Sequence, residues 1–154
     1  MMIDNSERRA EPAPPAQVPV VRREPAATAS GPGRLLVAVY GVLALAATGR
    51  AGWELYSKFH EAPIPYALSA FSAVVYVVAT VALARGRGLA RAVAWVTISV
   101  ELLGVLSVGT VSMLRPEDFP RSTVWSGFGQ GYGYVPLLLP ILGLIWLWRT
   151  RPAG

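Results

Sequence analysis

Glu101 is the residue whose chemistry is most unusual for its surroundings, because it lies in the otherwise apolar run VTISVELLGVLSVGT at 96–110. A carboxylate at the centre of a membrane is costly and normally faces a protein interior or water. Helical spacing puts Thr97, Gly104 and Ser112 on its face. A carboxyl group there could fix helix register through hydrogen bonds, pass a proton or cation, bind a polar ligand or contact a partner subunit.

A second polar stripe precedes this segment and could supply a partner for Glu101. Ser69, Ser72, Tyr76 and Thr80 are spaced by three or four residues, so they share one side of a helix. Tyr76 lies midway along its apolar segment, at about the depth expected for Glu101. Because buried polar groups are normally hydrogen-bonded, we expect the Tyr76 hydroxyl to donate to the carboxyl group.

Arg50 is a further candidate partner, and its sequence neighbours allow two arrangements. Its guanidinium could form an ion pair with Glu101. It could instead pair with Glu54, four residues later on the same helix, in a surface stripe that continues to Lys58. We favour the surface stripe, with the arginine extended towards the membrane surface.

The segment GFGQGYGY at 127–134 suggests binding motifs but matches none of them. Its alternating glycines fail the dinucleotide and phosphate-loop patterns. Its GYG lacks the Thr-Val that precedes this triplet in potassium filters. The aromatic residues around it, namely Trp125, Phe128, Tyr132 and Tyr134, are typical of an interfacial belt. A shallow external ligand site remains an alternative, with Trp125, Gly129, Gln130 and Tyr132 as its candidate residues.

Composition argues against enzymatic, metal and nucleic-acid functions. Cysteine is absent, which excludes thiolate catalysis and thiolate metal sites. The one histidine, His60, cannot form a two-histidine metal or haem site. The net charge is +5, but ten of the fourteen basic residues fall on one side of a four-span topology. The charge therefore predicts membrane orientation, with both termini cytoplasmic. We expect no enzymatic activity, no metal, no cofactor and no nucleic-acid partner.

The elements that must position these side chains are apolar helices. The chain is 53% hydrophobic and 15% charged, whereas soluble domains carry about 25% charged residues. Its apolar runs approach the length of about 20 residues needed to cross a bilayer. The sequence predicts an all-α membrane protein with a four-transmembrane-helix antiparallel bundle. The predicted parts are a disordered cytoplasmic tail at 1–33, a transmembrane domain at 34–149 with spans near 35–53, 66–84, 92–114 and 129–148, and a cytoplasmic tail at 150–154.

The fourth span is short, and its start is left with two alternatives. The plainly apolar part, 135–148, rises only about 21 Å as a helix, less than the core thickness of about 30 Å. Either the helix begins near Gly129, or the glycine-rich segment enters the outer leaflet as non-helical backbone that protein or water must satisfy. Pro136 and Pro140 also favour a kink.

Three segments carry a resemblance to a known group of proteins. HEAPIPYALSA, SVELLGVLSVGT and STVWSGFGQGYGYVPLLLPILGL resemble small four-span integral membrane proteins of high-GC Gram-positive bacteria, a group without a characterised activity. The resemblance covers residues 34–149 and implies a bundle in the bacterial plasma membrane. It transfers no functional residue.

Two functional hypotheses follow from the small size and the polar interior. The first is a non-enzymatic accessory or interaction subunit of a membrane complex, whose partners are the lipid bilayer and either other membrane proteins or further copies of itself. The alternative is a small proton- or ion-coupled transporter, or a channel-like protein, that uses the polar interior around Glu101.

Overall fold

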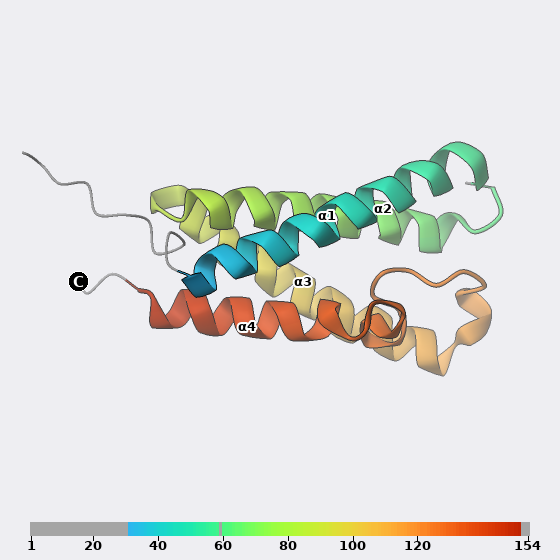
Figure 1. Cartoon of the computed structure of the whole chain (residues 1–154). Coiled ribbons are helices and arrows are strands. Elements are labelled where there is room, and N and C mark those ends of the chain that lie inside the picture. Colours follow the sequence, from blue (N-terminus) through green and yellow to red (C-terminus); the bar gives the residue numbers. More distant parts are fainter. Residues whose placement is uncertain (1–30, 59, 152–154) are drawn as a thin grey trace, which may run out of the picture.

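The computed structural model describes residues 31–58 and 60–151, without the side chain of Lys58, and this part of the chain is helical and contains no strand. The predicted tail at 1–33 lies mostly outside it, as does most of 150–154. The four long helices lie alongside one another, as Figure 1 shows. The elements are α1 (Gly31–Lys58), α2 (Pro63–Arg85), α3 (Gly88–Leu114), the short 3-10 helices η2 (Pro116–Asp118) and η3 (Ser126–Tyr132), and α4 (Val135–Arg149).

Turn chemistry sets the boundary between α2 and α3. Gly86 ends α2 in the left-handed conformation, with φ of 61°, and its N–H donates to the Ala82 carbonyl. Glycine adopts this conformation without steric cost. Only Gly86 and Arg87 separate the two helices, so α2 and α3 run antiparallel as neighbours, as the short link predicts.

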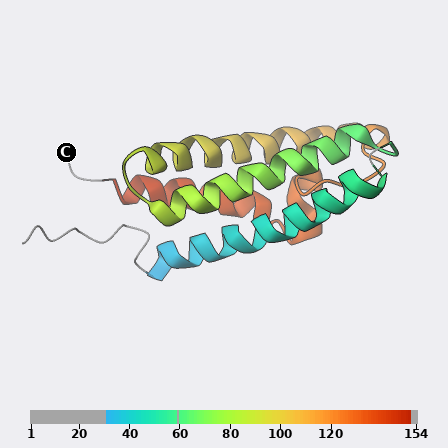
Figure 2. The same cartoon turned by 90° about the horizontal axis from the view of Figure 1, so that it is seen from above.

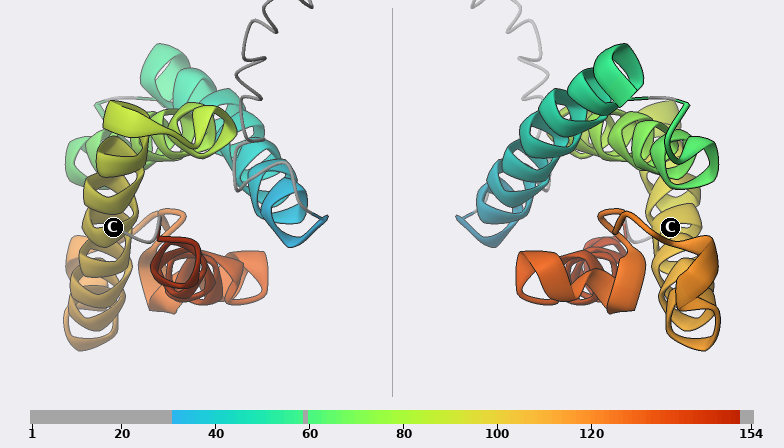
Figure 3. Two further views of the ribbon diagram at one scale, coloured as in Figure 1. Left: turned by 90° about the vertical axis from the view of Figure 1, so that its left-hand side faces the viewer. Right: turned by 90° about the vertical axis from the view of Figure 1, so that its right-hand side faces the viewer.

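The helices form an open arrangement in which α1 and α4 are its two edges. Seen along the helix axes, α2 lies against α1 and α3, while α4 packs on α3 (Figure 3). The view from above shows α1, α2 and α3 running alongside one another (Figure 2). Of the long-helix pairs that touch, α1 and α4 have the smallest contact. Any side-chain contact between α1 and α3 must therefore cross the interior of the bundle.

An arginine joins the beginning of α3 to the end of α4. The Arg91 guanidinium donates to the Leu147 carbonyl and to the Thr150 hydroxyl, the second at 3.1 Å. Next to it, the Arg151 guanidinium lies over the Trp95 ring at 5.2 Å from its centroid, a cation–π contact. The last carbonyls of a helix lack intrahelical donors. Arg91 supplies a donor to one of them, the Leu147 carbonyl.

The residues before α4 do not form a continuous helix with it. Of the two alternatives for the start of the fourth span, a helix that begins near Gly129 is wrong, since α4 begins at Val135. Gly127, Phe128 and Gly129 have φ of 55°, 58° and 82°, which a right-handed helix excludes. The chain makes a compact left-handed turn there. The direction of η3 differs from that of α4 by 100°.

Length and composition qualify most of these helices as membrane spans. α1, α2 and α3 are each long and apolar enough to cross a bilayer, and the bent pair of η3 and α4 makes a fourth candidate. Among the described residues this gives three to four candidate spans, in agreement with the membrane class predicted from the sequence.

Candidate functional site

The polar centre of the bundle is a hydrogen bond between α1 and α3. The Tyr40 hydroxyl donates to Oε2 of Glu101 at 2.8 Å, and both side chains are fully buried. The other carboxyl oxygen, Oε1, is also buried and has no hydrogen-bond partner in the described part of the chain. Because the backbones of α1 and α3 do not pack directly against each other, this side-chain pair links helices across the interior.

Tyr40 was not among the residues that sequence reasoning selected, and helix depth explains why. The expected first span starts at 35, which puts Tyr40 close to the membrane surface. In the structure α1 starts at Gly31, so Tyr40 lies about 14 Å along it, and Glu101 lies about 20 Å along α3. A phenol side chain can cover this offset. The available signal was a tyrosine inside an apolar run, VAVYGVLAL at 37–45.

Tyr76 has a different partner from the predicted one. Its hydroxyl oxygen accepts a hydrogen bond from Trp125 Nε1–H at 3.1 Å. No hydrogen bond joins Tyr76 to Glu101, although the rings of Tyr76 and Tyr40 lie 6.4 Å apart. The expected Tyr76–Glu101 bond is therefore wrong, because the Tyr76 hydroxyl instead accepts a hydrogen bond from the Trp125 indole, in the segment before η3.

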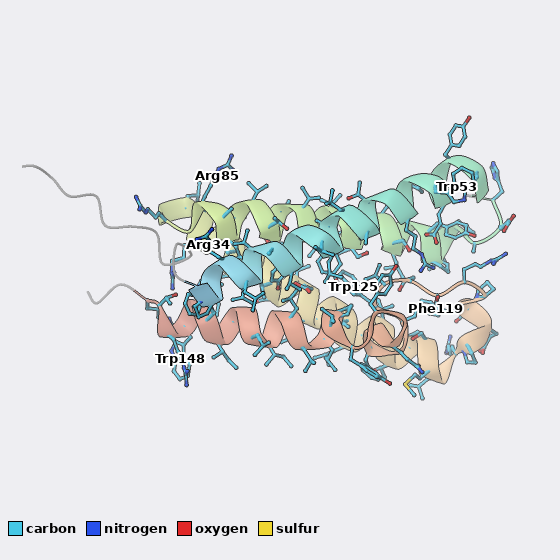
Figure 4. All side chains as sticks on the ribbon, viewed as in Figure 1. Arg34, Trp53, Arg85, Phe119, Trp125 and Trp148 are labelled. Atoms are coloured by element: carbon cyan, nitrogen blue, oxygen red, sulfur yellow. The ribbon has the colours of Figure 1, made fainter. Side chains whose placement is uncertain are left out.

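Trp125 is the residue that closes the bundle interior. Its side chain is 1% exposed and meets the Phe71 ring edge-on at 6.0 Å between centroids. Figure 4 shows it between the helices, in the half of the bundle nearer Phe119. The indole lies directly on Gly104, where an added Cβ would come within 2.5 Å of the ring. Gly104, the small residue on the Glu101 face of α3, thus leaves room for this indole.

The hydroxyl groups of the predicted polar cluster bond to their own helices. Thr97 donates to the Val93 carbonyl at 2.7 Å, and Thr80 donates to the Tyr76 carbonyl at 2.7 Å. Ser72 donates to the carbonyl of Ser69 at 2.8 Å. Bonding to the preceding turn is an ordinary way for serine and threonine to satisfy a hydroxyl in a helix. These residues therefore share the interior with Glu101 without binding its carboxyl group.

Arg50 binds Glu54, and it also joins α1 to the segment between α3 and α4. Its Nε donates to Oε1 of Glu54 at 2.7 Å. Its two terminal nitrogens donate to the Ser122 carbonyl and, at 3.3 Å, to the Tyr132 hydroxyl. The favoured Arg50–Glu54 pairing is therefore confirmed, and the alternative ion pair between Arg50 and Glu101 is absent from the described residues. The guanidinium is held by protein groups instead of extending freely to the surface.

The four residues of the predicted external site do not share an open surface. Trp125 and Gly129 are buried, whereas Gln130 is exposed and Tyr132 is partly exposed. This expectation is therefore corrected, because the indole turns inward and Gly129 packs under Pro136. The same packing removes Trp125 from the predicted interfacial belt.

The outer face of the bundle carries four apolar grooves between helices, with volumes of about 350 to 560 Å³. Neither Glu101 nor Tyr40 lines any of these four. Since both side chains are fully buried, the polar centre is enclosed by packed side chains, and what it can do chemically in this conformation is to link α1 to α3 across the interior.

Replacing Tyr40 by phenylalanine tests this role. We expect Tyr40→Phe to lower the free energy of unfolding by about 1–3 kcal/mol, because Glu101 then keeps no hydrogen bond in a buried position. The measurement is denaturant unfolding in mild detergent followed by circular dichroism. Tyr66→Phe is the control, since Tyr66 is 2% exposed and its hydroxyl makes no hydrogen bond in the described structure. Equal effects of the two variants would contradict the role of the Tyr40–Glu101 bond.

The apolar helices and the enclosed polar centre define the class of protein: a small, all-helical protein with three to four helices able to cross a membrane. Comparison of the chain with protein-family models, curated proteins and solved structures finds no match.

Proposed function

We propose that this chain is a four-span antiparallel bundle of the bacterial plasma membrane that acts without catalysis, as an accessory or interaction subunit of a membrane complex. The observation that supports it most directly is the enclosure of the polar centre. Glu101, Tyr40 and Tyr76 are fully buried, and the four grooves open on the outside of the bundle. A molecule of this form offers its outer face for recognition more readily than it offers a path through its interior.

The distribution of charge supports the proposed orientation. Six arginines lie at the end where α1 and α3 begin and α2 and α4 end, and no acidic residue of the described chain lies there. The exposed acids Glu61, Glu117 and Asp118 lie at the opposite end. An excess of positive charge marks the cytoplasmic side of a membrane protein. We therefore propose that both termini of the bundle lie in the cytoplasm.

One observation favours the alternative of a proton- or ion-coupled transporter. Oε1 of Glu101 is a buried carboxyl oxygen without a partner, and intramembrane carboxyl groups commonly belong to ion or proton pathways. A second conformation that admits water to Glu101 would give such a pathway.

Flux measurements combined with co-purification separate the two functions. We expect purified protein in liposomes to pass protons no faster than protein-free liposomes, measured with an internal pH-sensitive dye. We also expect the tagged protein to retain a stoichiometric membrane partner, or a second copy of itself, after gentle extraction and cross-linking.

The Glu101→Gln variant provides the contrasting outcome. Glutamine keeps the shape of the side chain and an acceptor for Tyr40, but it cannot carry a proton. A pH-dependent flux in the wild type that falls at least about tenfold in Glu101→Gln, as expected for loss of a general acid–base group, would replace the accessory role by the transporter.

A further inference from the structure

The largest of the four grooves lies between the first turns of α1 and the length of α4, with a volume of about 560 Å³. It follows from the small contact between these two helices, which stand apart at the open edge in Figure 3. Its walls are aliphatic side chains of both helices, among them Leu35 and Val39 of α1 and Leu138, Leu142 and Ile145 of α4.

One end of this apolar groove carries a cation. Arg149 lines the groove at the last turn of α4 and is exposed. Its guanidinium makes no hydrogen bond or ion pair within residues 31–58 and 60–151. Trp146, one turn earlier, also lines the groove, and its indole N–H is buried without an acceptor. Unused donors thus gather at one end of an otherwise aliphatic surface.

The surroundings of Arg149 favour an anionic partner. It belongs to the end of the bundle that holds six arginines and, in the part of the chain that the structure describes, no acid. Figure 4 shows Arg34 and Arg85 at this same end. Clusters of basic residues beside apolar surfaces between helices are typical of sites that bind acidic phospholipid headgroups.

The size of the groove fits one lipid chain. From Arg149 to Val135 the lining follows α4 for about 21 Å. One leaflet of the hydrocarbon core is about 15 Å thick, so an acyl chain extending from a headgroup at Arg149 stays within the groove. The volume also falls within the usual range of about 300–1,000 Å³ for binding sites of small molecules.

We propose that the α1–α4 groove binds an acyl chain of an anionic phospholipid whose phosphate pairs with Arg149. The selectivity follows from net charge: a zwitterionic lipid brings its own ammonium group next to the phosphate, whereas phosphatidylglycerol does not. A bound lipid of this kind explains why an aliphatic groove wall and an unpaired guanidinium occur in the same place. It would operate in an accessory subunit and in a transporter alike.

Photo-cross-linking of lipid to α4 tests the proposal. The full chain is placed in vesicles of equal parts phosphatidylcholine and phosphatidylglycerol, with a trace of either lipid carrying a diazirine on its acyl chain. Adducts are located by peptide mass spectrometry. We expect phosphatidylglycerol adducts on α4 to exceed phosphatidylcholine adducts about fivefold, the equivalent of about 1 kcal/mol for one basic residue near a membrane surface. In Arg149→Gln the ratio should approach one.

Two further variants separate this site from a general effect of charge. Arg85→Gln removes one charge from the same end of the bundle, but Arg85 lines a different groove between α2 and α3. It should leave the adduct ratio on α4 unchanged. Leu142→Trp fills the α1–α4 groove and should reduce α4 adducts of both lipids. A wild-type ratio near one, or an equal loss in Arg149→Gln and Arg85→Gln, would overturn the proposal.

Discussion

Replacing Trp125 by alanine is expected to lower the free energy of unfolding by about 3–5 kcal/mol, the usual range for removing a buried aromatic side chain. The indole is 1% exposed, lies on Gly104 and meets Phe71 edge-on. Its removal leaves a cavity and also takes away the donor that satisfies Tyr76. Denaturant unfolding in mild detergent, followed by circular dichroism, measures the loss.

Trp148→Ala is the matched control for this change. Trp148 is the same residue type in the same bundle, but 64% of it is exposed. We expect a change within about 0.5 kcal/mol, as for other surface substitutions. Trp125→Phe should fall between the two, because it retains one aromatic ring but loses the second ring of the indole and its N–H. Equal stabilities of Trp125→Ala and Trp148→Ala would contradict the role of the buried indole.

Adding one methyl group at Gly109 is expected to destabilise the protein by about 1–3 kcal/mol, the usual cost of overpacking. A Cβ at this position of α3 would lie 2.8 Å from the backbone nitrogen of Phe128 and 2.6 Å from its ring. A backbone atom cannot rotate out of the way. The neighbouring turn is also fixed, because the Gly127 N–H donates to the Ser112 hydroxyl at 2.9 Å.

Gly49→Ala is the control for Gly109→Ala. Gly49 lies inside α1, and an added Cβ would meet nothing within 4 Å. Alanine favours a helix over glycine by about 1 kcal/mol, so Gly49→Ala should leave the stability unchanged or raise it. If both substitutions have the same sign and size in thermal unfolding, the segment before α4 is not packed on Gly109.

Composition and helical periodicity allowed the all-helical class, the membrane-length apolar helices and part of the interior to be predicted. Ser69, Ser72 and Tyr76 are spaced on one helical face, and all three are buried. The Arg50–Glu54 pair follows from a separation of four residues on one helix. These features depend on residues that are close in sequence. The helix geometry alone therefore brings them together.

The partners of the polar residues could not be predicted, because they depend on contacts between distant segments. Tyr40 and Glu101 are 61 residues apart, and their meeting depends on how α1 packs across the interior from α3. Composition favours a position at the membrane surface for Trp125, because aromatic residues are common there. Its inward direction depends on Gly104, since only a glycine leaves room for the indole on α3. The left-handed turn at 127–129 could not be predicted, because Phe128 has a positive φ, which is rare for residues other than glycine.

The short length of α4 has a consequence for the membrane around the protein. α1 has 28 residues and α4 has 15, which correspond to lengths of about 42 Å and 22 Å. α1 is long enough to cross a bilayer core of about 30 Å, whereas the core would have to become thinner beside α4. Such a mismatch costs fractions of a kcal/mol per ångström and sorts proteins by bilayer thickness. The α4 side should therefore favour lipids with short acyl chains, or a neighbouring protein that shields it from the bilayer.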